Sequence, residues 1–289
     1  MSGKNKEALF EAANNLKEKA HSKDEVNFRV IITGKGGAGK TTTTAILAHL
    51  FAEDNYNVLA IDEDPQMNLP YALGMDFEKA KNIVPVSKNF DYIEEKTGAR
   101  PGTSWGLFLN LTPDISDVVD KFGVKITDNI NLLVMGTVVQ AATGCLCPEN
   151  ALLDAIVKYI SLRKNEIILM DTQAGVEHFG RALSKGFKHC VIVSDATFNA
   201  LDVANHTANL ARQIGIKHIY LAINRVRSQK DIEKVESRIE DKGKFDRIFY
   251  IPYNEKVIEY EPSVVGLIKE NGDFMQVYKQ IKEVLKNNL

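Results

Sequence analysis

The chain has 289 residues, of which 44% are hydrophobic and 26% are charged, and this composition is typical of a globular protein. Its formal net charge of −2, without a long basic block, gives no support for a nucleic-acid or anionic-membrane partner. Three cysteines are too few, and an odd number, for a secreted disulfide framework, so we expect a reducing, cytoplasmic location.

The first predicted element is an amphipathic helix over residues 1–26, because Leu9, Leu16 and Ala20 recur at helical spacing among polar residues. This segment lacks the apolar core of a signal peptide. No stretch reaches the roughly 18 consecutive apolar residues that cross a bilayer, so we expect a soluble protein with no membrane partner. We predict one domain, residues 27–289, after this N-terminal extension.

Seven buried strands are predicted from short apolar runs: residues 28–34, 56–62, 129–136, 165–171, 189–195, 218–224 and 247–252. Helices are predicted at 38–54, 147–164 and 274–285, and prolines break the pattern between 65 and 125 into short helices and loops. Apolar strands that alternate with helices predict an α/β fold, with a mostly parallel central sheet covered by helices on both faces.

A glycine-rich motif lies between the first predicted strand and the helix after it. Its sequence GKGGAGKT, Gly34 to Thr41, fits the P-loop pattern G-x-x-x-x-G-K-[ST]. The glycines let successive backbone N–H groups curve around phosphate oxygens, and the helix N-terminus adds its positive dipole end. We expect Lys40 to neutralise the β- and γ-phosphates of a nucleotide and the Thr41 hydroxyl to ligate Mg²⁺. The predicted nucleotide contacts here are Gly36, Gly37, Ala38, Gly39, Lys40, Thr41 and Thr42.

A second lysine in this motif, Lys35, makes the segment KGGAGKT resemble the deviant Walker A motif of the nitrogenase-iron-protein, MinD and ParA class of dimeric ATPases. The resemblance implies a P-loop NTPase fold and Mg²⁺-dependent hydrolysis of ATP to ADP and phosphate. It also implies that Lys35 reaches across a homodimer to the partner's nucleotide. The segment IDEDPQMNL resembles switch I of this class, in which Asp64 would position or deprotonate the attacking water. Asp62 would be an outer magnesium ligand or a simple strand-end cap.

The segment IILMDTQAG resembles the Walker B motif of the same class running into switch II. By this resemblance, Asp171 would hold the Mg²⁺ shell through water, and the backbone N–H of Gly175 would sense the γ-phosphate. Asn224 and Arg225 lie where the class reads adenine. Pro252 and Tyr253 lie in the segment that usually borders the adenine base in this class.

Two cysteines, Cys145 and Cys147, stand one residue apart at the start of a predicted helix with Pro148 in its first turn. A helix N-terminus lowers the pKa of a thiol and favours the metal-binding thiolate. Two ligands cannot close a tetrahedral soft-metal site. If two protomers face one another across ATP, one Cys-x-Cys from each makes a four-thiolate site that suits Ni²⁺ or Zn²⁺. Packing or redox roles are the alternative, and Cys190 is predicted to be a buried apolar residue.

The segments GCLCPEN and AGVEHFGRA together resemble the carbon monoxide dehydrogenase accessory ATPases, the CooC-type nickel maturation proteins, from about residue 28 onward. The resemblance implies a metallochaperone whose nucleotide-gated dimer inserts nickel into a client, carbon monoxide dehydrogenase or acetyl-CoA synthase. His178 is either an auxiliary metal ligand or, more simply, a hydrogen-bonded structural residue. The N-terminal helix departs from the family pattern.

Two other functions stay open on the sequence. A ParA- or MinD-like positioning ATPase would need a membrane-binding terminal helix or a basic DNA-binding face. The C-terminal helix is amphipathic, but its apolar stripe is explained more simply by core packing. An iron-protein-like electron-transfer ATPase would need a bridging cluster, and position 178 carries histidine where the iron protein has a second cluster cysteine.

Overall fold

The computed structural model describes residues 27–101, 109–136, 147–160, 166–173, 186–239 and 241–287. The helix predicted for residues 1–26 lies outside them, so the division of the chain at residue 26 stays a prediction. Within the described residues, no helix is long and apolar enough to cross a membrane.

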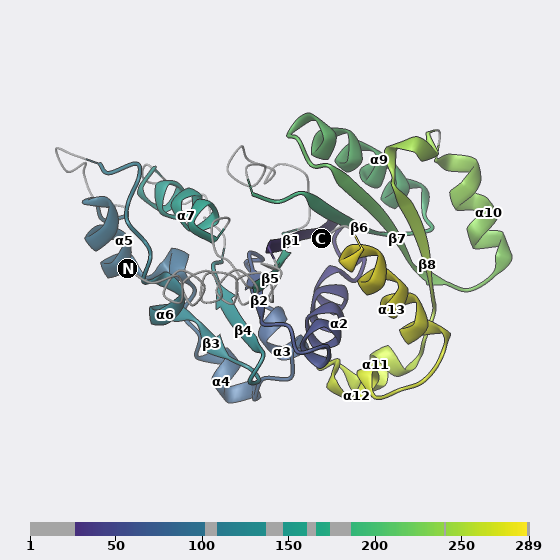
Figure 1. Ribbon diagram of the computed structural model, residues 1–289, viewed down its shortest axis with the longest axis horizontal. Helices are drawn as coiled ribbons and strands as arrows, with labels where there is room; N and C mark the ends of the chain where they lie inside the picture. Colours follow the sequence, from purple (N-terminus) through teal and green to yellow (C-terminus); the bar gives the residue numbers. More distant parts are fainter. Residues whose placement is uncertain are drawn as a thin grey trace, which may run out of the picture.

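An eight-stranded sheet forms the centre of the fold, in the order β3-β4-β2-β5-β1-β6-β7-β8 (Figure 1). Neighbouring strands are parallel except for β3 and β4, so the predicted mostly parallel α/β sheet is confirmed. The strands are β1 Asn27–Gly34, β2 Val58–Asp62, β3 Val124–Lys125, β4 Ile130–Val134, β5 Glu166–Asp171, β6 His189–Asp195, β7 His218–Val226 and β8 Arg247–Pro252. The two-residue strand β3 is absent from the predicted elements, because so short an antiparallel edge strand leaves no alternating pattern in the sequence.

Helices cover both faces of the sheet, as predicted. They are α2 Lys40–Glu53, α3 Leu69–Ala72, α4 Phe77–Lys81, α5 Phe90–Thr97, α6 Val118–Phe122, α7 Cys147–Ile160, α9 Phe198–Gln213, α10 Gln229–Arg238, α11 Lys256–Tyr260, α12 Val265–Ile268 and α13 Asp273–Lys286, with 3-10 helices η1 Val86–Lys88 and η2 Lys242–Lys244. Helices α2, α3, α12 and α13 pack on one face, and α5, α6, α7, α9 and α10 pack on the other. Helices α9 and α10 are absent from the predicted elements.

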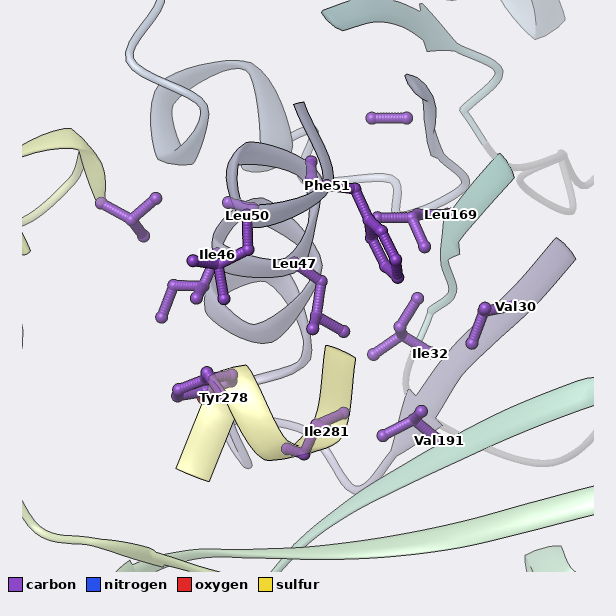
Figure 2. Close-up of a cluster of buried hydrophobic side chains, with 14 of the residues drawn as sticks. Val30, Ile32, Ile46, Leu47, Leu50, Phe51, Leu169, Val191, Tyr278 and Ile281 are labelled. Carbon is purple, nitrogen blue, oxygen red and sulfur yellow. The ribbon is translucent and has the colours of Figure 1, made fainter. Parts of the chain in front are cut away.

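Side chains of the central strand β1 enter both cores, because successive residues of a strand point to opposite faces. Val30 and Ile32 pack beneath α2 and α13, whereas Ile31 belongs to the core on the other face. Figure 2 shows Ile32 between Val30 and Leu47 of α2, with Ile281 of α13 near Val191 and Tyr278 farther off, on the side of Ile46. A strand buried on both faces reads as an uninterrupted apolar run, which is why this strand is predictable from sequence.

The C-terminal helix α13 holds α2 in place through two polar contacts besides its apolar stripe. The hydroxyl groups of Thr43 and Tyr278 lie 3.1 Å apart within the core. Lys282 donates a 2.8 Å hydrogen bond to the Asp54 carboxylate at the end of α2, and this bond lowers the pKa of Asp54. The predicted packing of the C-terminal stripe against the core is therefore confirmed.

Parallel register brings polar residues together at the carboxyl edge of the sheet. Asp171 at the end of β5 is level with Asp62 on β2 and with Ile32 on β1. On the other side of β1, Asp195 at the end of β6 is level with Asn224 on β7. Ligands of open α/β sheets gather at this edge, so the fold places the sequence motifs where a ligand site is expected.

At the opposite edge, a buried histidine begins β6. His189 is 3% exposed, and its ring lies 4.5 Å from Phe28 and stacks on His218 at 4.8 Å. Burial lowers the pKa of His189 to about 4, with His218 and then Lys188 acting in the same direction and Asp246 opposing them. The ring is therefore neutral in the folded protein above this pH, whereas an unfolded histidine gains a proton near pH 6.5.

This difference in pKa predicts a loss of stability in mild acid. Between pH 6.5 and 4 the unfolded chain binds a proton at position 189 that the folded chain does not, so stability falls as the pH falls through this window. We expect His189→Phe to remove up to about 3 kcal/mol of that acid destabilisation. Urea unfolding of both proteins at several pH values measures it, with the exposed His206→Gln as control. Parallel pH profiles for wild type and His189→Phe would contradict the assignment.

Candidate nucleotide-binding site

The loop between β1 and α2 is shaped by a glycine that no other residue can replace without strain. Gly39 has φ 105°, in the left-handed region, and a Cβ there would collide with the amide nitrogen of Asn224. That amide donates a 2.8 Å hydrogen bond to the Ala38 carbonyl. Asn224 at the end of β7 therefore braces the P-loop from a position 186 residues away.

A cleft of about 590 Å³ opens in front of this loop, within the range of ~300–1,000 Å³ that is usual for ligand sites. Eight of the predicted site residues line it, namely Gly36, Gly37, Gly39, Lys40, Thr41, Thr42, Asp64 and Arg225. The structure thus brings together residues from the P-loop, the segment after β2 and the end of β7. A glycine loop at a helix N-terminus on one wall and acidic residues beside it fit a nucleotide phosphate chain with its metal.

Thr41 and Asp171 are joined across the floor of the site. The Thr41 hydroxyl donates a 2.6 Å hydrogen bond to Oδ2 of Asp171, which is 1% exposed. Oδ1 of Asp171 is buried with no hydrogen-bond partner among the described residues. Burial raises the pKa of Asp171 well above its usual range, and Asp62 adds to this rise. A hydroxyl oxygen beside a carboxylate that needs a cation matches the oxygen donors that Mg²⁺ takes, so these residues fit the ion.

Lys40 begins α2 and is 7% exposed. Its ammonium group lies 3.4 Å from the carbonyl oxygen of Lys35. Burial lowers the pKa of Lys40, while Asp171 and Asp64 raise it. A buried cation that forms no ion pair with a described residue is well placed to receive the anionic phosphates, which compensate its charge.

Asp62 organises the segment after β2. One carboxylate oxygen accepts the N–H of Asp64 at 2.9 Å, and the other accepts the N–H of Leu69 at 3.0 Å. Burial raises the pKa of Asp62 to about 7. Its hydrogen bonds are those of a strand-end cap, the simpler of its two predicted roles, and they hold Asp64 at the cleft.

Glu63 is a half-buried acidic residue that the sequence motif does not single out. Its N–H donates a 3.0 Å hydrogen bond to the Asp171 carbonyl, which ties the segment after β2 to the end of β5. Burial, and then the charge of Asp62, raises the pKa of Glu63 to about 8. Asp62 and Asp171 lie close to one another behind the P-loop, with Glu63 beside Asp62, and this negative charge favours a cation there.

The residues predicted to border the adenine base are not the ones that line the cleft in the structure. Pro252 and Tyr253 are absent from the residues that line it; the Tyr253 ring instead lies 4.6 Å from the guanidinium of Arg227. Glu261 and Pro262, which follow α11, line the cleft in their place. Tyr71, Asn68 and Gln173 line it as well; Asn68 and Gln173 belong to the two segments that resemble the switches, although neither was predicted as a contact, and no motif indicates Tyr71.

Several predicted residues lie elsewhere. Lys35 is exposed and does not line the cleft of its own chain, and Ala38 is buried beneath the loop. Gly175, His178 and Cys145 lie outside the described residues, whereas Cys147 is the first residue of α7. Within the described side chains, which exclude both of these cysteines, no group of three or more metal-ligating residues gathers.

The fold and this cleft define a P-loop ATPase, and comparison with known proteins gives the family. Residues 29–263 match the CobQ/CobB/MinD/ParA nucleotide binding domain, so the chain belongs to this family. It is 38% identical over 233 residues to an uncharacterized ATP-binding protein of Methanocaldococcus jannaschii, covering 81% of this chain and 88% of that protein. It is also 35% identical over 229 residues to the carbon monoxide dehydrogenase accessory protein CooC of Rhodospirillum rubrum, covering 79% of this chain and 85% of CooC.

Solved structures share the fold. The MinD cell division protein of Aquifex aeolicus is 20% identical and aligns with a TM-score of 0.62 over 90% of this chain and 97% of its own. A plasmid partition protein of Borrelia burgdorferi aligns with a TM-score of 0.59 at 18% identity, over 91% of this chain and 99% of its own. The predicted P-loop fold, the MinD/ParA class and the ATPase activity are thereby confirmed.

Proposed function

We propose that this protein is an ATP-hydrolysing metallochaperone that inserts nickel during maturation of carbon monoxide dehydrogenase or acetyl-CoA synthase. The observation that carries the proposal is the Cys-x-Cys pair, Cys145 and Cys147, of which Cys147 begins α7, in a chain 35% identical to CooC over 79% of its length. Nickel is the cargo of this cycle, and ATP with Mg²⁺ drives it.

The cleft supplies the groups for ATP hydrolysis. In our proposal Lys40 binds the β- and γ-phosphates, and Thr41 with Asp171 holds the magnesium ion, which neutralises phosphate charge when bound. Asp64 positions the attacking water, since it lines the cleft and its backbone is fixed by Asp62. Gly175 senses the γ-phosphate.

The other end of the nucleotide extends toward β7. In this proposal Asn224 and Arg225 contact the adenine. The structure supports this role for Arg225 more strongly than for Asn224. Arg225 lines the cleft directly, whereas the Asn224 amide already binds the Ala38 carbonyl and so acts on the loop. Glu261 and Pro262 line the same cleft and are the neighbours of the base that the geometry favours. Pro252 and Tyr253 stay a prediction from resemblance.

The exposed position of Lys35 supports dimerisation on ATP. Its side chain is exposed and lies outside the cleft of its own chain, so it is available to the nucleotide of a partner protomer. Two chains that face one another across ATP bring Cys145 and Cys147 together with their copies. Four thiolates then hold Ni²⁺, or Zn²⁺ in its place, between the protomers.

In this proposal nickel is released when the population of dimers shifts from a closed state to an open state. The γ-phosphate makes contacts in the closed dimer that are absent from the open one, so its removal by hydrolysis favours opening. Opening separates the two thiol pairs, and each pair alone is an incomplete site for the metal.

The test is delivery of nickel to a nickel-free client. Nickel-loaded protein with Mg-ATP should activate carbon monoxide dehydrogenase or acetyl-CoA synthase even when a chelator scavenges free nickel from solution. A non-hydrolysable ATP analogue in place of ATP should slow activation, because opening requires loss of the γ-phosphate. Activation that matches free nickel, and that the chelator abolishes equally, would refute delivery by this protein.

A further inference from the structure

A second cavity, of about 330 Å³, lies away from the nucleotide cleft, between α9, the end of α10 and η2. Figure 1 shows α9 and α10 on the β6–β8 half of the fold. One stripe of α9 forms its floor, with Phe198, Asn205 and Asn209 spaced so that they share a helix face. Arg238 and Lys244 form the opposite wall. We call this cavity the α9 groove.

The polar side chains of the α9 groove are unused. Asn205, Asn209 and Lys244 make no side-chain hydrogen bond or ion pair with any described residue. The guanidinium of Arg238 forms no ion pair there either and lies 4.9 Å from the ring of Phe198, which is 64% exposed. The groove therefore presents free donors around an open aromatic surface.

Cations next to the groove do have acidic partners among the described residues, so the lack of one is particular to Arg238 and Lys244. Arg212, on α9, pairs with Asp246 at 3.2 Å, and Lys242, on the same short helix as Lys244, pairs with Glu236 at 3.7 Å. Among the described residues that line the groove, two cations without an ion pair, Arg238 and Lys244, face one carboxylate, that of Asp202. The excess of positive charge selects an anionic occupant, and Asp202 disfavours the continuous phosphate backbone of a nucleic acid.

We propose that the α9 groove binds an acidic peptide segment of a partner protein. Arginine and lysine bind carboxylates, and the planar guanidinium of Arg238 can do so with two parallel hydrogen bonds. An apolar side chain of the segment covers Phe198, and the amides of Asn205 and Asn209 satisfy its backbone. The volume suits a few side chains of an extended segment.

Docking in the groove is coupled to the nucleotide. Helix α9 begins three residues after Asp195, whose carboxylate accepts a 3.3 Å hydrogen bond from Arg225. Arg225 lines the nucleotide cleft, so a nucleotide that moves Arg225 changes the strand end from which α9 starts. Coupling between two binding sites is reciprocal, so the segment alters the affinity for Mg-ATP by the same factor that Mg-ATP alters the affinity for the segment. This inference does not depend on the metal chemistry proposed above.

Fluorescence anisotropy of a short fluorescein-labelled peptide that alternates glutamate with leucine tests the proposal on the full chain. We expect binding to wild type, and binding weaker by about tenfold or more for Arg238→Gln and for Lys244→Gln. Their matched controls are Arg247→Gln, an arginine that lies over Phe249 outside the groove, and Lys242→Gln. All four variants should keep the basal ATPase rate.

The coupling has its own readout. Mg-ATP should change the peptide affinity by about fivefold or more relative to nucleotide-free protein, and Asp195→Asn should keep peptide binding but lose this dependence. No binding of the peptide, equal weakening in the control variants, or equal binding of a lysine–leucine peptide would overturn the acidic-segment assignment. Single-stranded DNA that binds with the same sensitivity to Arg238→Gln would assign the groove to nucleic acid instead.

Discussion

Replacing Lys40 with alanine should abolish nucleotide binding, with affinity for Mg-ATP reduced by about 100-fold or more. Among the residues that line the cleft, Lys40 and Arg225 are the two cations, and only Lys40 lies in the P-loop. Its removal leaves phosphate charge without a partner beside the carboxylates of Asp64 and Asp171. Isothermal titration calorimetry with Mg-ATP measures the loss.

Lys35→Ala is the matched control, because it removes a lysine from the same loop. Lys35 is exposed and outside the cleft, so nucleotide binding should persist within a few-fold of wild type. Turnover should fall by roughly 100-fold or more if Lys35 reaches the partner's nucleotide, as a cation supplied in trans does in other phosphoryl transfers. Equal loss of binding in the two variants would contradict the division of roles between them.

Thermal unfolding shows whether these effects come from the site or from the fold. Burial lowers the pKa of Lys40, so its charge is not held there for stability, and Lys40→Ala should unfold near the wild-type temperature.

Replacing both thiols of the Cys-x-Cys pair, Cys145→Ala with Cys147→Ala, should abolish metal binding and leave ATP hydrolysis in place. Wild type should bind about one Ni²⁺ or Zn²⁺ per dimer, since two thiolates from each chain complete a four-ligand site. Neither cysteine is among the groups proposed to bind the nucleotide, so the double variant should still hydrolyse ATP. Equilibrium dialysis with metal analysis, together with sedimentation with and without ATP, measures both properties.

Cys190 supplies the control for this experiment. It is fully buried on β6, and burial raises the pKa of its thiol, so it is a poor ligand. Cys190→Ala should keep full metal binding. The shared-site proposal fails if the double variant retains its metal affinity and still dimerises with metal.

The features that the sequence predicted correctly are those encoded by the residue pattern of one short segment. The strand that ends at Gly34, the P-loop and the helix that starts at Lys40 occupy a continuous stretch, and the spacing of glycine and lysine encodes their geometry without reference to the rest of the chain. Asp62 and Asp171 were predictable for the same reason, because each ends an apolar run, and parallel strands share a carboxyl edge.

Contacts between distant segments were not predictable in this way. The hydrogen bond from Thr41 to Asp171 spans 130 residues, and the bond from Asn224 to Ala38 spans 186. Glu261 rather than Tyr253 reaches the cleft because the chain continues through α11 before it turns back toward the nucleotide. Such contacts depend on the order of the strands, which the sequence does not state locally.

The sequence by itself therefore determined the kind of elements, the phosphate loop and the two thiols that motivate the proposed function, because periodicity and motif spacing are properties of short segments. Only the tertiary structure decided which side chains line the cleft, that Asp62 caps its strand, and that Arg238 and Lys244 face α9 without an ion pair to any residue that the structure describes. These features arise when strand order β2-β5-β1-β6-β7 brings remote segments side by side, and packing then fixes the burial and charge of each group.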